Sequence, residues 1–144
     1  MIKLSSKVRY ALLALLELAS QYEQGNCLQI DQIVASQPIP EGYLVQVLIA
    51  LRRCGLVSSQ RGARGGYSLN KAPWEITLFQ IVACLEGKPQ PWGQETSLNA
   101  ENLLIEKIWQ EAENSVTTVL GSYTLQDLCD RREKSRCSNS MFYI

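Results

Sequence analysis

The segment GLVSSQRGARGGYSL, residues 55–69, constrains the fold of this chain more than any other stretch. Apolar residues stand at both of its ends, and three glycines stand in its middle around Arg61 and Arg64. Glycine adopts positive φ angles easily and lets a backbone approach another surface closely. The segment therefore predicts a β-hairpin whose tip presents two cations to a partner.

Three amphipathic stretches come before this hairpin. The first helix is expected from Ser5 to about Gln24, with Ser5 or Ser6 as its cap and an end at Gly25. A short second helix stops at Pro38, and a third runs from about Pro40 to Gly55. The predicted inward-facing residues of the second and third helices are Ile30, Ile33, Val34, Leu44, Val47, Leu48 and Leu51. Helix, short helix, helix and hairpin is the order of a winged helix-turn-helix, whose third helix enters the major groove of DNA.

The second half of the chain predicts more helix. A fourth helix is expected within residues 74–87, a linker follows, and a long helix runs from about Asn99 to Leu120. The long helix has a wide apolar stripe that a compact winged unit does not cover, so we expect a second copy of the chain to cover it. The predicted dimerisation residues are Leu104, Ile105, Ile108, Trp109, Ala112, Val116 and Val119. After it we expect a short helix over 125–134 and a loose tail.

The predicted fold class is mainly α: a winged helix-turn-helix with a two-stranded wing and a long C-terminal dimerisation helix. The expected division is a DNA-binding domain at 1–87, a linker at 88–98, a dimerisation helix region at 99–130 and a tail at 131–144. The net charge differs between the two halves of the chain. Residues 1–73 hold eight Lys/Arg against four acids, a net of +4, and residues 74–144 hold six against ten, a net of −4. A basic module with an acidic appendage is typical of a nucleic-acid binder.

Composition excludes several classes of function. The longest apolar run, Tyr10 to Ala19, is interrupted by Glu17 and is too short to span a bilayer, and no signal peptide is visible. Five scattered cysteines fit a reducing cytoplasm better than a disulfide scaffold. The chain has no histidine and no GxxxxGK[ST] phosphate loop, so we expect no enzyme. The expected location is the cytoplasm.

The stretches LSSKVRYALLALLELA, YLVQVLIALRRCGLVSSQRGARGGYSLNK and ITLFQIVACLEG carry a more specific signal. Over residues 2–87 the chain closely resembles the bacterial winged-helix repressors related to the iron–sulfur cluster assembly regulator. The nitric-oxide-sensing and cysteine-metabolism repressors belong to the same group. The segment IWQEAENSVTTVLGSYTLQDL resembles their dimerisation helix more loosely.

The resemblance implies a homodimer on a partly palindromic site in double-stranded DNA, with Arg61 in the minor groove. A glutamate that discriminates bases in some members is replaced here by Val45. From the residues themselves, Gln46 can pair with adenine, and Val45 and Ile49 can pack on thymine methyl groups. Ser5, Lys7 and Arg9 match positions that approach the phosphate backbone. The predicted DNA-contacting residues are Ser5, Lys7, Arg9, Glu41, Gly42, Tyr43, Val45, Gln46, Ile49, Arg52, Arg53, Arg61 and Arg64.

The cysteines depart from those of the cluster-binding members, which carry three closely spaced cysteines between the fourth helix and the dimerisation helix. Residues 87–98 contain none here, so no cofactor is predicted from motifs. Cys54 and Cys84 are interpreted as small buried apolar residues. Cys129 and Cys137 flank the basic run DRREKSR, and nearby positive charge stabilises a thiolate and favours oxidation or metal binding. They are the candidate thiols for a metal or an iron–sulfur cluster, to which a dimer could contribute four.

The sequence thus predicts a dimeric, sequence-specific transcriptional regulator, a repressor by resemblance, with an unknown effector and operator. Two alternatives stay open. One is a redox-sensing or iron–sulfur-sensing regulator that uses Cys129 and Cys137. The other belongs to a different class: a winged helix used as a protein-interaction module, whose wing arginines dock an acidic partner.

Overall fold

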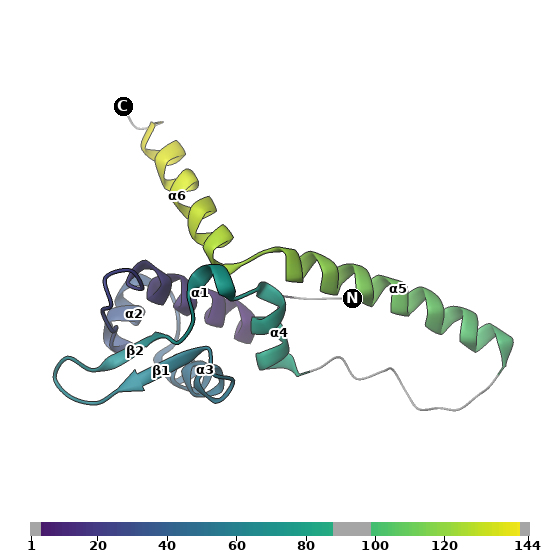
Figure 1. The fold of residues 1–144 in the computed structure, drawn as a ribbon, viewed down its shortest axis with the longest axis horizontal. Coiled ribbons are helices and arrows are strands. Elements are labelled where there is room, and N and C mark those ends of the chain that lie inside the picture. The colour runs from purple at the N-terminus through teal and green to yellow at the C-terminus, as the bar shows by residue number, and fades with distance from the viewer. Residues whose placement is uncertain (1–3, 88–98, 142–144) are drawn as a thin grey trace.

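The computed structural model describes residues 4–87 and 99–141, with the side chains of 139–141 left aside. The described chain is mostly helical, with a single hairpin (Figure 1). Its elements are α1 (Ser6–Ser20), α2 (Ile30–Ser36), α3 (Glu41–Arg53), β1 (Val57–Gln60), β2 (Gly66–Leu69), the 3-10 helix η1 (Pro73–Glu75), α4 (Leu78–Glu86), α5 (Ala100–Ser122) and α6 (Leu125–Met141). The predicted order and class are confirmed.

The starts of α1 and α3 follow from the residues that precede them. The Ser5 hydroxyl accepts a hydrogen bond from the backbone N–H of Val8 at 3.2 Å, which confirms Ser5 as the cap of α1. α1 ends at Ser20, earlier than predicted, because the chain turns there and reaches a φ of 69° at Gly25. α3 begins directly after Pro40. Its buried face packs against α1, and the core residues of the two helices are Val8, Ala11, Ala14, Leu15, Leu18, Leu44, Val47, Leu48 and Leu51.

The hairpin pairs β1 with β2 in antiparallel register, from Val57 opposite Leu69 to Gln60 opposite Gly66. A backbone bridge that the sequence did not predict also joins the hairpin to the segment between α1 and α2. Leu28 donates its N–H to the Tyr67 carbonyl at 2.9 Å and accepts the Tyr67 N–H at 2.7 Å. Gly66 allows this close approach, since a Cβ at this position would lie 2.5 Å from the Leu28 carbonyl oxygen.

The C-terminal half differs from its prediction in one respect. α5 confirms the long helix and has no buried residue on the single chain. α6, however, extends to Met141, so the expected tail at 131–144 is wrong over residues 131–141. Its first residue, Leu125, is fully buried in the core of the winged unit, and α6 packs against α1 and η1. The start of α6 therefore completes the fold that we expected residues 1–87 to complete alone.

Two of the cysteines are bonded to each other. A disulfide joins Cys54, the C-cap of α3, to Cys84 in α4. The expectation that Cys54 is a buried apolar residue is wrong, because its side chain is exposed. The preference for free thiols over disulfides fails for this pair as well. Cys54 stands between Arg53 and Gly55 at the exposed end of a helix. The apolar residues elsewhere in α3 led to the expectation that it is buried.

Candidate DNA-binding surface

The outer face of α3 is open to solvent. Its buried positions recur every three or four residues, and helical periodicity turns the intervening residues away from the core. Glu41, Gly42, Tyr43, Gln46 and Ile49 are exposed, whereas Val45 is half-buried. The face presents an amide, an aromatic ring and aliphatic carbon, which are groups that can read base edges and thymine methyl groups in a major groove.

The hairpin tip carries the cations. Arg61 and Arg64 are exposed in the loop between β1 and β2, where Gly62 has a φ of 110°. Arg52, another predicted contact, has a partner within the fold as well: its guanidinium donates to the Ser59 hydroxyl at 3.1 Å and joins the end of α3 to β1. It remains exposed, so it positions the wing while keeping its charge near the surface.

The start of α1 contributes the third group of predicted contacts. Lys7 and Arg9 are exposed. The Ser5 hydroxyl is occupied within the fold, since it caps α1 and also donates to a carboxylate oxygen of Glu86 at 2.6 Å. Tyr10 and Tyr43 meet edge to face with ring centres 5.4 Å apart, which fixes α1 against α3.

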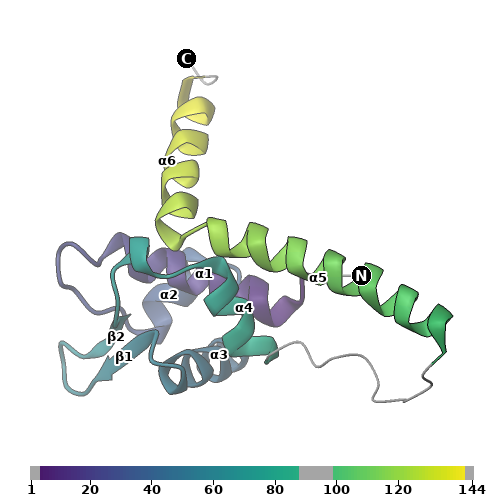
Figure 2. The same cartoon turned by 45° about the vertical axis from the view of Figure 1, so that its right-hand side comes forward.

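The predicted residues are thus divided between three elements: the start of α1, the outer face of α3 and the hairpin. Two views place α3 and the β1–β2 hairpin along the same lower face, with α6 pointing away from it (Figures 1 and 2). We call the exposed predicted residues of these elements, together with the half-buried Val45, the α3–wing surface: Lys7, Arg9, Glu41, Gly42, Tyr43, Val45, Gln46, Ile49, Arg52, Arg53, Arg61 and Arg64.

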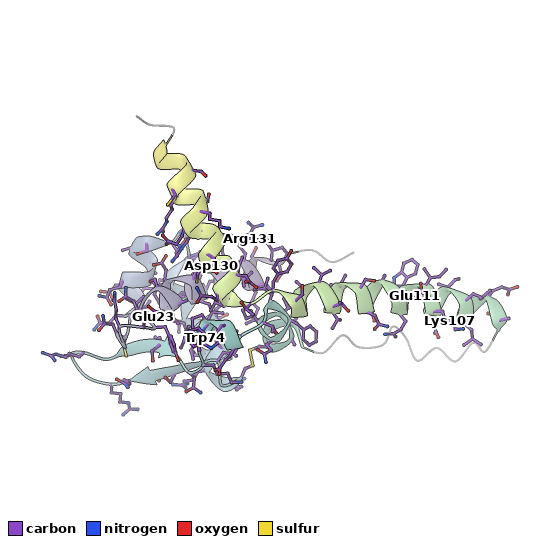
Figure 3. All side chains as sticks on the ribbon, turned by 45° about the horizontal axis from the view of Figure 1, so that its top comes forward. Glu23, Trp74, Lys107, Glu111, Asp130 and Arg131 are labelled. Atoms are coloured by element: carbon purple, nitrogen blue, oxygen red, sulfur yellow. A yellow bond between two sulfur atoms is a disulfide. The ribbon has the colours of Figure 1, made fainter. Side chains whose placement is uncertain are left out.

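A second exposed surface lies on α5, whose side chains project along a helix that leaves the winged unit (Figure 3). Of the predicted dimerisation residues, Leu104, Ile105, Ile108, Trp109 and Val119 are 54–62% exposed; Ala112 is exposed and Val116 half-buried. Leu103, also exposed, was missed because it lies off the predicted stripe. An uncovered apolar row of this length on a single chain is typical of an interaction surface.

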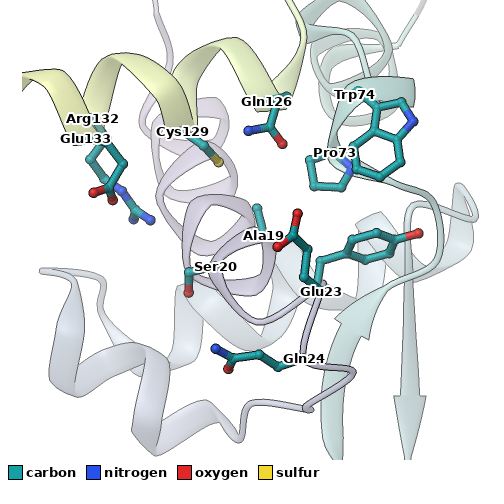
Figure 4. Close-up of a pocket in the computed structure, with 11 residues that line it drawn as sticks. Ala19, Ser20, Glu23, Gln24, Pro73, Trp74, Gln126, Cys129, Arg132 and Glu133 are labelled. Atoms are coloured by element: carbon teal, nitrogen blue, oxygen red, sulfur yellow. The ribbon is translucent and has the colours of Figure 1, made fainter.

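A cavity of about 280 Å³ lies away from both surfaces, between the end of α1, η1 and the start of α6 (Figure 4). Trp74 and Glu23 stand on one side of it and Cys129 and Arg132 on the other. The Arg132 guanidinium lies 3.3 Å from a carboxylate oxygen of Glu17, which ties α6 to α1. Burial raises the pKa of the Cys129 thiol above its usual range, and this outweighs the opposing effect of Arg132. This direction is opposite to the lowered thiol pKa that the basic run led us to expect at Cys129.

Comparison with known proteins decides the family. The Rrf2 family, described as an iron-dependent transcriptional regulator, matches residues 4–131. The chain belongs to the Rrf2 family. The family resemblance seen in the sequence is confirmed, and the chain is a DNA-binding transcriptional regulator rather than an enzyme.

Several Rrf2 relatives match along most of the chain. A Synechocystis protein assigned as an HTH-type transcriptional regulator is 41% identical over 129 residues, which cover 88% of this chain and 86% of the relative. CymR of Bacillus subtilis is 36% identical over 142 residues, 99% of each chain. The solved structure of this CymR, the global cysteine regulator of that organism, has a TM-score of 0.78 at 34% identity and covers 91% of this chain and 98% of its own. The structure of T. potens IscR has a TM-score of 0.76 at 30% identity and covers 93% and 90%.

The family description names iron, in keeping with the cluster alternative, so we tested whether the residues present fit an iron site. Iron–sulfur clusters are held by several converging thiolates. Within the described residues no three His, Cys, Asp or Glu side chains converge. Cys129 and Cys137 are eight residues apart on α6, about 12 Å along a helix axis. The described part of one chain does not fit a cluster, and the undescribed residues 88–98 contain no cysteine.

No helix in the described residues is both long and apolar enough to cross a bilayer.

Proposed function

We propose that this Rrf2 protein is a homodimeric repressor that recognises a partly palindromic operator in double-stranded DNA. The observation that carries the proposal is the α3–wing surface, in which α3 has an open outer face and packs against β1 of a hairpin whose tip carries two exposed arginines. α3 would read bases in the major groove, chiefly through Gln46, and Arg61 would enter the adjacent minor groove. Lys7, Arg9 and Arg64 would contact phosphates and set the register of the protein on the duplex.

Dimerisation through α5 supports this mode of binding. Two-fold DNA sites are bound by two-fold proteins whose recognition helices are about 34 Å apart, one turn of DNA. The exposed apolar residues of α5 lie outside the α3–wing surface, so a second copy can cover them and leave both recognition helices free. We therefore assign residues 1–87, with the start of α6, to DNA binding and residues 100–122 to dimerisation.

A repressor of this design acts by occupying an operator where a polymerase would otherwise start. Its partner would be chromosomal DNA, so we assign the protein to the bacterial cytoplasm.

The test is selection of bound sites from random duplex DNA, followed by affinity measurements on the selected site. Arg61→Ala should weaken specific binding several-fold and leave the thermal midpoint unchanged, because the side chain is exposed at a hairpin tip. Arg136→Ala is the matched control: it removes the same charge from an exposed position on α6. Equal affinities for the wild type and Arg61→Ala would contradict the wing assignment.

The same selection separates the alternatives. Enrichment of a two-fold sequence supports the proposal. Binding with no sequence preference, together with capture of an acidic protein that Arg61→Ala abolishes, would favour the protein-interaction module instead.

A further inference from the structure

The Cys54–Cys84 disulfide joins the C-terminal end of α3, the proposed recognition helix, to α4. Cys54 is the residue at which α3 ends, and Cys84 lies in the last turn of α4. The two Cα atoms are 6.0 Å apart, within the range of about 4.4–6.8 Å in which a disulfide forms without backbone movement. Both wing strands lie in the segment between the two cysteines. One covalent loop therefore starts at the C-cap of α3 and contains the whole wing and most of α4.

α4 is itself fixed to the segment that leads from α5 into α6. The N–H of Leu78, the first residue of α4, donates to the Tyr123 carbonyl at 3.0 Å. The N–H of Leu125 donates to the Ile76 carbonyl at 2.8 Å, and Thr77 and Thr124 form an isolated bridge. The disulfide thus connects α3, through α4, to the end of the helix that carries the exposed apolar row.

The chemical setting makes this bond unusual. A regulator that binds bacterial DNA works where thiols are kept reduced, and cytosolic disulfides in most organisms are transient and catalytic or redox-sensing. Cys54 is exposed and Cys84 half-buried, so a small reagent can reach the pair from the Cys54 side. The Cys54 side chain is accessible because Cys54 stands at a helix end next to Gly55 rather than in the core.

We propose that Cys54 and Cys84 form a reversible redox modification site, and that its oxidation tightens operator binding. The thiolate of Cys54 attacks a low-molecular-weight disulfide, forming a mixed disulfide and releasing one thiolate of that reagent. The thiolate of Cys84 then attacks the Cys54 sulfur, closes the protein disulfide and releases the second thiolate. Two protein thiols are oxidised, one external disulfide is reduced to two thiols, and the two protons pass from the cysteines to the released thiolates.

The effect on affinity rests on the proposed function. In the oxidised protein the end of α3 is bonded to α4. Less conformational entropy is therefore lost when the two recognition helices of a dimer bind in successive major grooves. Binding that needs less ordering is tighter for the same contacts. Reduction leaves those contacts in place and restores the motion of α3 relative to α4.

The experiment equilibrates the full-length protein in glutathione buffers from fully reduced to fully oxidised. Peptide mapping of the oxidised protein should find a Cys54–Cys84 peptide two hydrogen atoms lighter than the separate peptides, and its thermal midpoint should be higher. Affinity for the selected operator, measured by fluorescence anisotropy, should be at least threefold tighter than for the reduced protein. Cys54→Ser and Cys84→Ser should match the reduced wild type in every buffer. Cys137→Ser, which alters an exposed cysteine on α6, should keep the full response.

Two results would overturn the proposal: no Cys54–Cys84 peptide in any buffer, or equal operator affinity for the reduced and oxidised wild type. Both use the unaltered protein, so they do not depend on how the serine variants fold. A wild type that binds no DNA in either state would instead overturn the proposed function and the affinity effect that rests on it. The linked peptide and the shifted thermal midpoint would then still establish the modification site.

Discussion

Replacing Ile108 with aspartate tests the dimer that the proposed DNA-binding mode requires. The Ile108 side chain is 61% exposed on the single chain. Complete burial of an isoleucine contributes roughly 1.5–3 kcal/mol, so covering the remaining surface contributes about 1–2 kcal/mol per protomer. A symmetric interface contains two copies, and losing both weakens association by about 2–4 kcal/mol, roughly 30- to 700-fold in the dissociation constant. The buried charge of the aspartate adds to this loss.

Thr117→Asp is the matched control. Thr117 is exposed and stands nine residues after Ile108 on the same helix, which places it on the side of α5 opposite Ile108. Its replacement introduces the same charge away from Ile108.

Sedimentation equilibrium measures the outcome directly. The wild type and Thr117→Asp should be dimers at micromolar concentration, whereas Ile108→Asp should be a monomer with weak affinity for a two-fold operator. A monomeric wild type would refute the reasoning, and so would an Ile108→Asp protein that dimerises like the wild type. If both variants dissociate equally, charge on α5 rather than apolar contact is responsible.

Three further predictions follow from individual residues. Gln46→Ala should relax base preference at one position of each half-site by about 1–3 kcal/mol; a site-selection profile that weakens uniformly would assign Gln46 to the DNA backbone. Gly66→Ala should destabilise the hairpin by about 1–3 kcal/mol and lower the thermal midpoint, because the glycine has a φ of 143° and its added Cβ would meet the Leu28 carbonyl. Gly42→Ala, in an open part of α3, should not lower it, and equal midpoints for the two variants would contradict the argument. Because burial raises the pKa of Cys129, alkylation of its thiol should begin at higher pH in the folded protein than in urea. The contribution of the neutral thiol to the free energy of unfolding is complete below the unfolded-state pKa and declines as pH rises. Alkylation profiles that coincide in the two states would contradict the burial.

Much of the fold could be predicted from the sequence because it depends on local chemistry. The cap at Ser5, the three- and four-residue spacing in α3 and the long periodic run of α5 all act within a few residues of chain. The glycine and arginine pattern of residues 61–66 likewise predicted a cationic hairpin tip, since positive φ angles are a property of single residues. The residues proposed to contact DNA stand on these local elements, which is why they could be named before the fold was known.

What remained hidden depends on segments that are far apart in sequence. No periodicity indicates that Leu125 enters the core beside α1, because its burial is decided by how α6 docks after α5 has left the winged unit. The length of α6 was hidden for the same reason. Its charged, weakly amphipathic residues predict a tail. The packing of its first turns against α1 and η1 nucleates the helix, which then continues along the chain.

The five cysteines illustrate both cases. The winged helix with its basic tip, the long apolar helix and the absence of cysteine from residues 87–98 can all be read from the residues in order. The bond between Cys54 and Cys84, 30 residues apart, and the separation of Cys129 from Cys137, eight apart, could not. A rigid helix holds its own residues at fixed distances, whereas the packing of α3 on α4 brings residues that are distant in sequence within bonding reach.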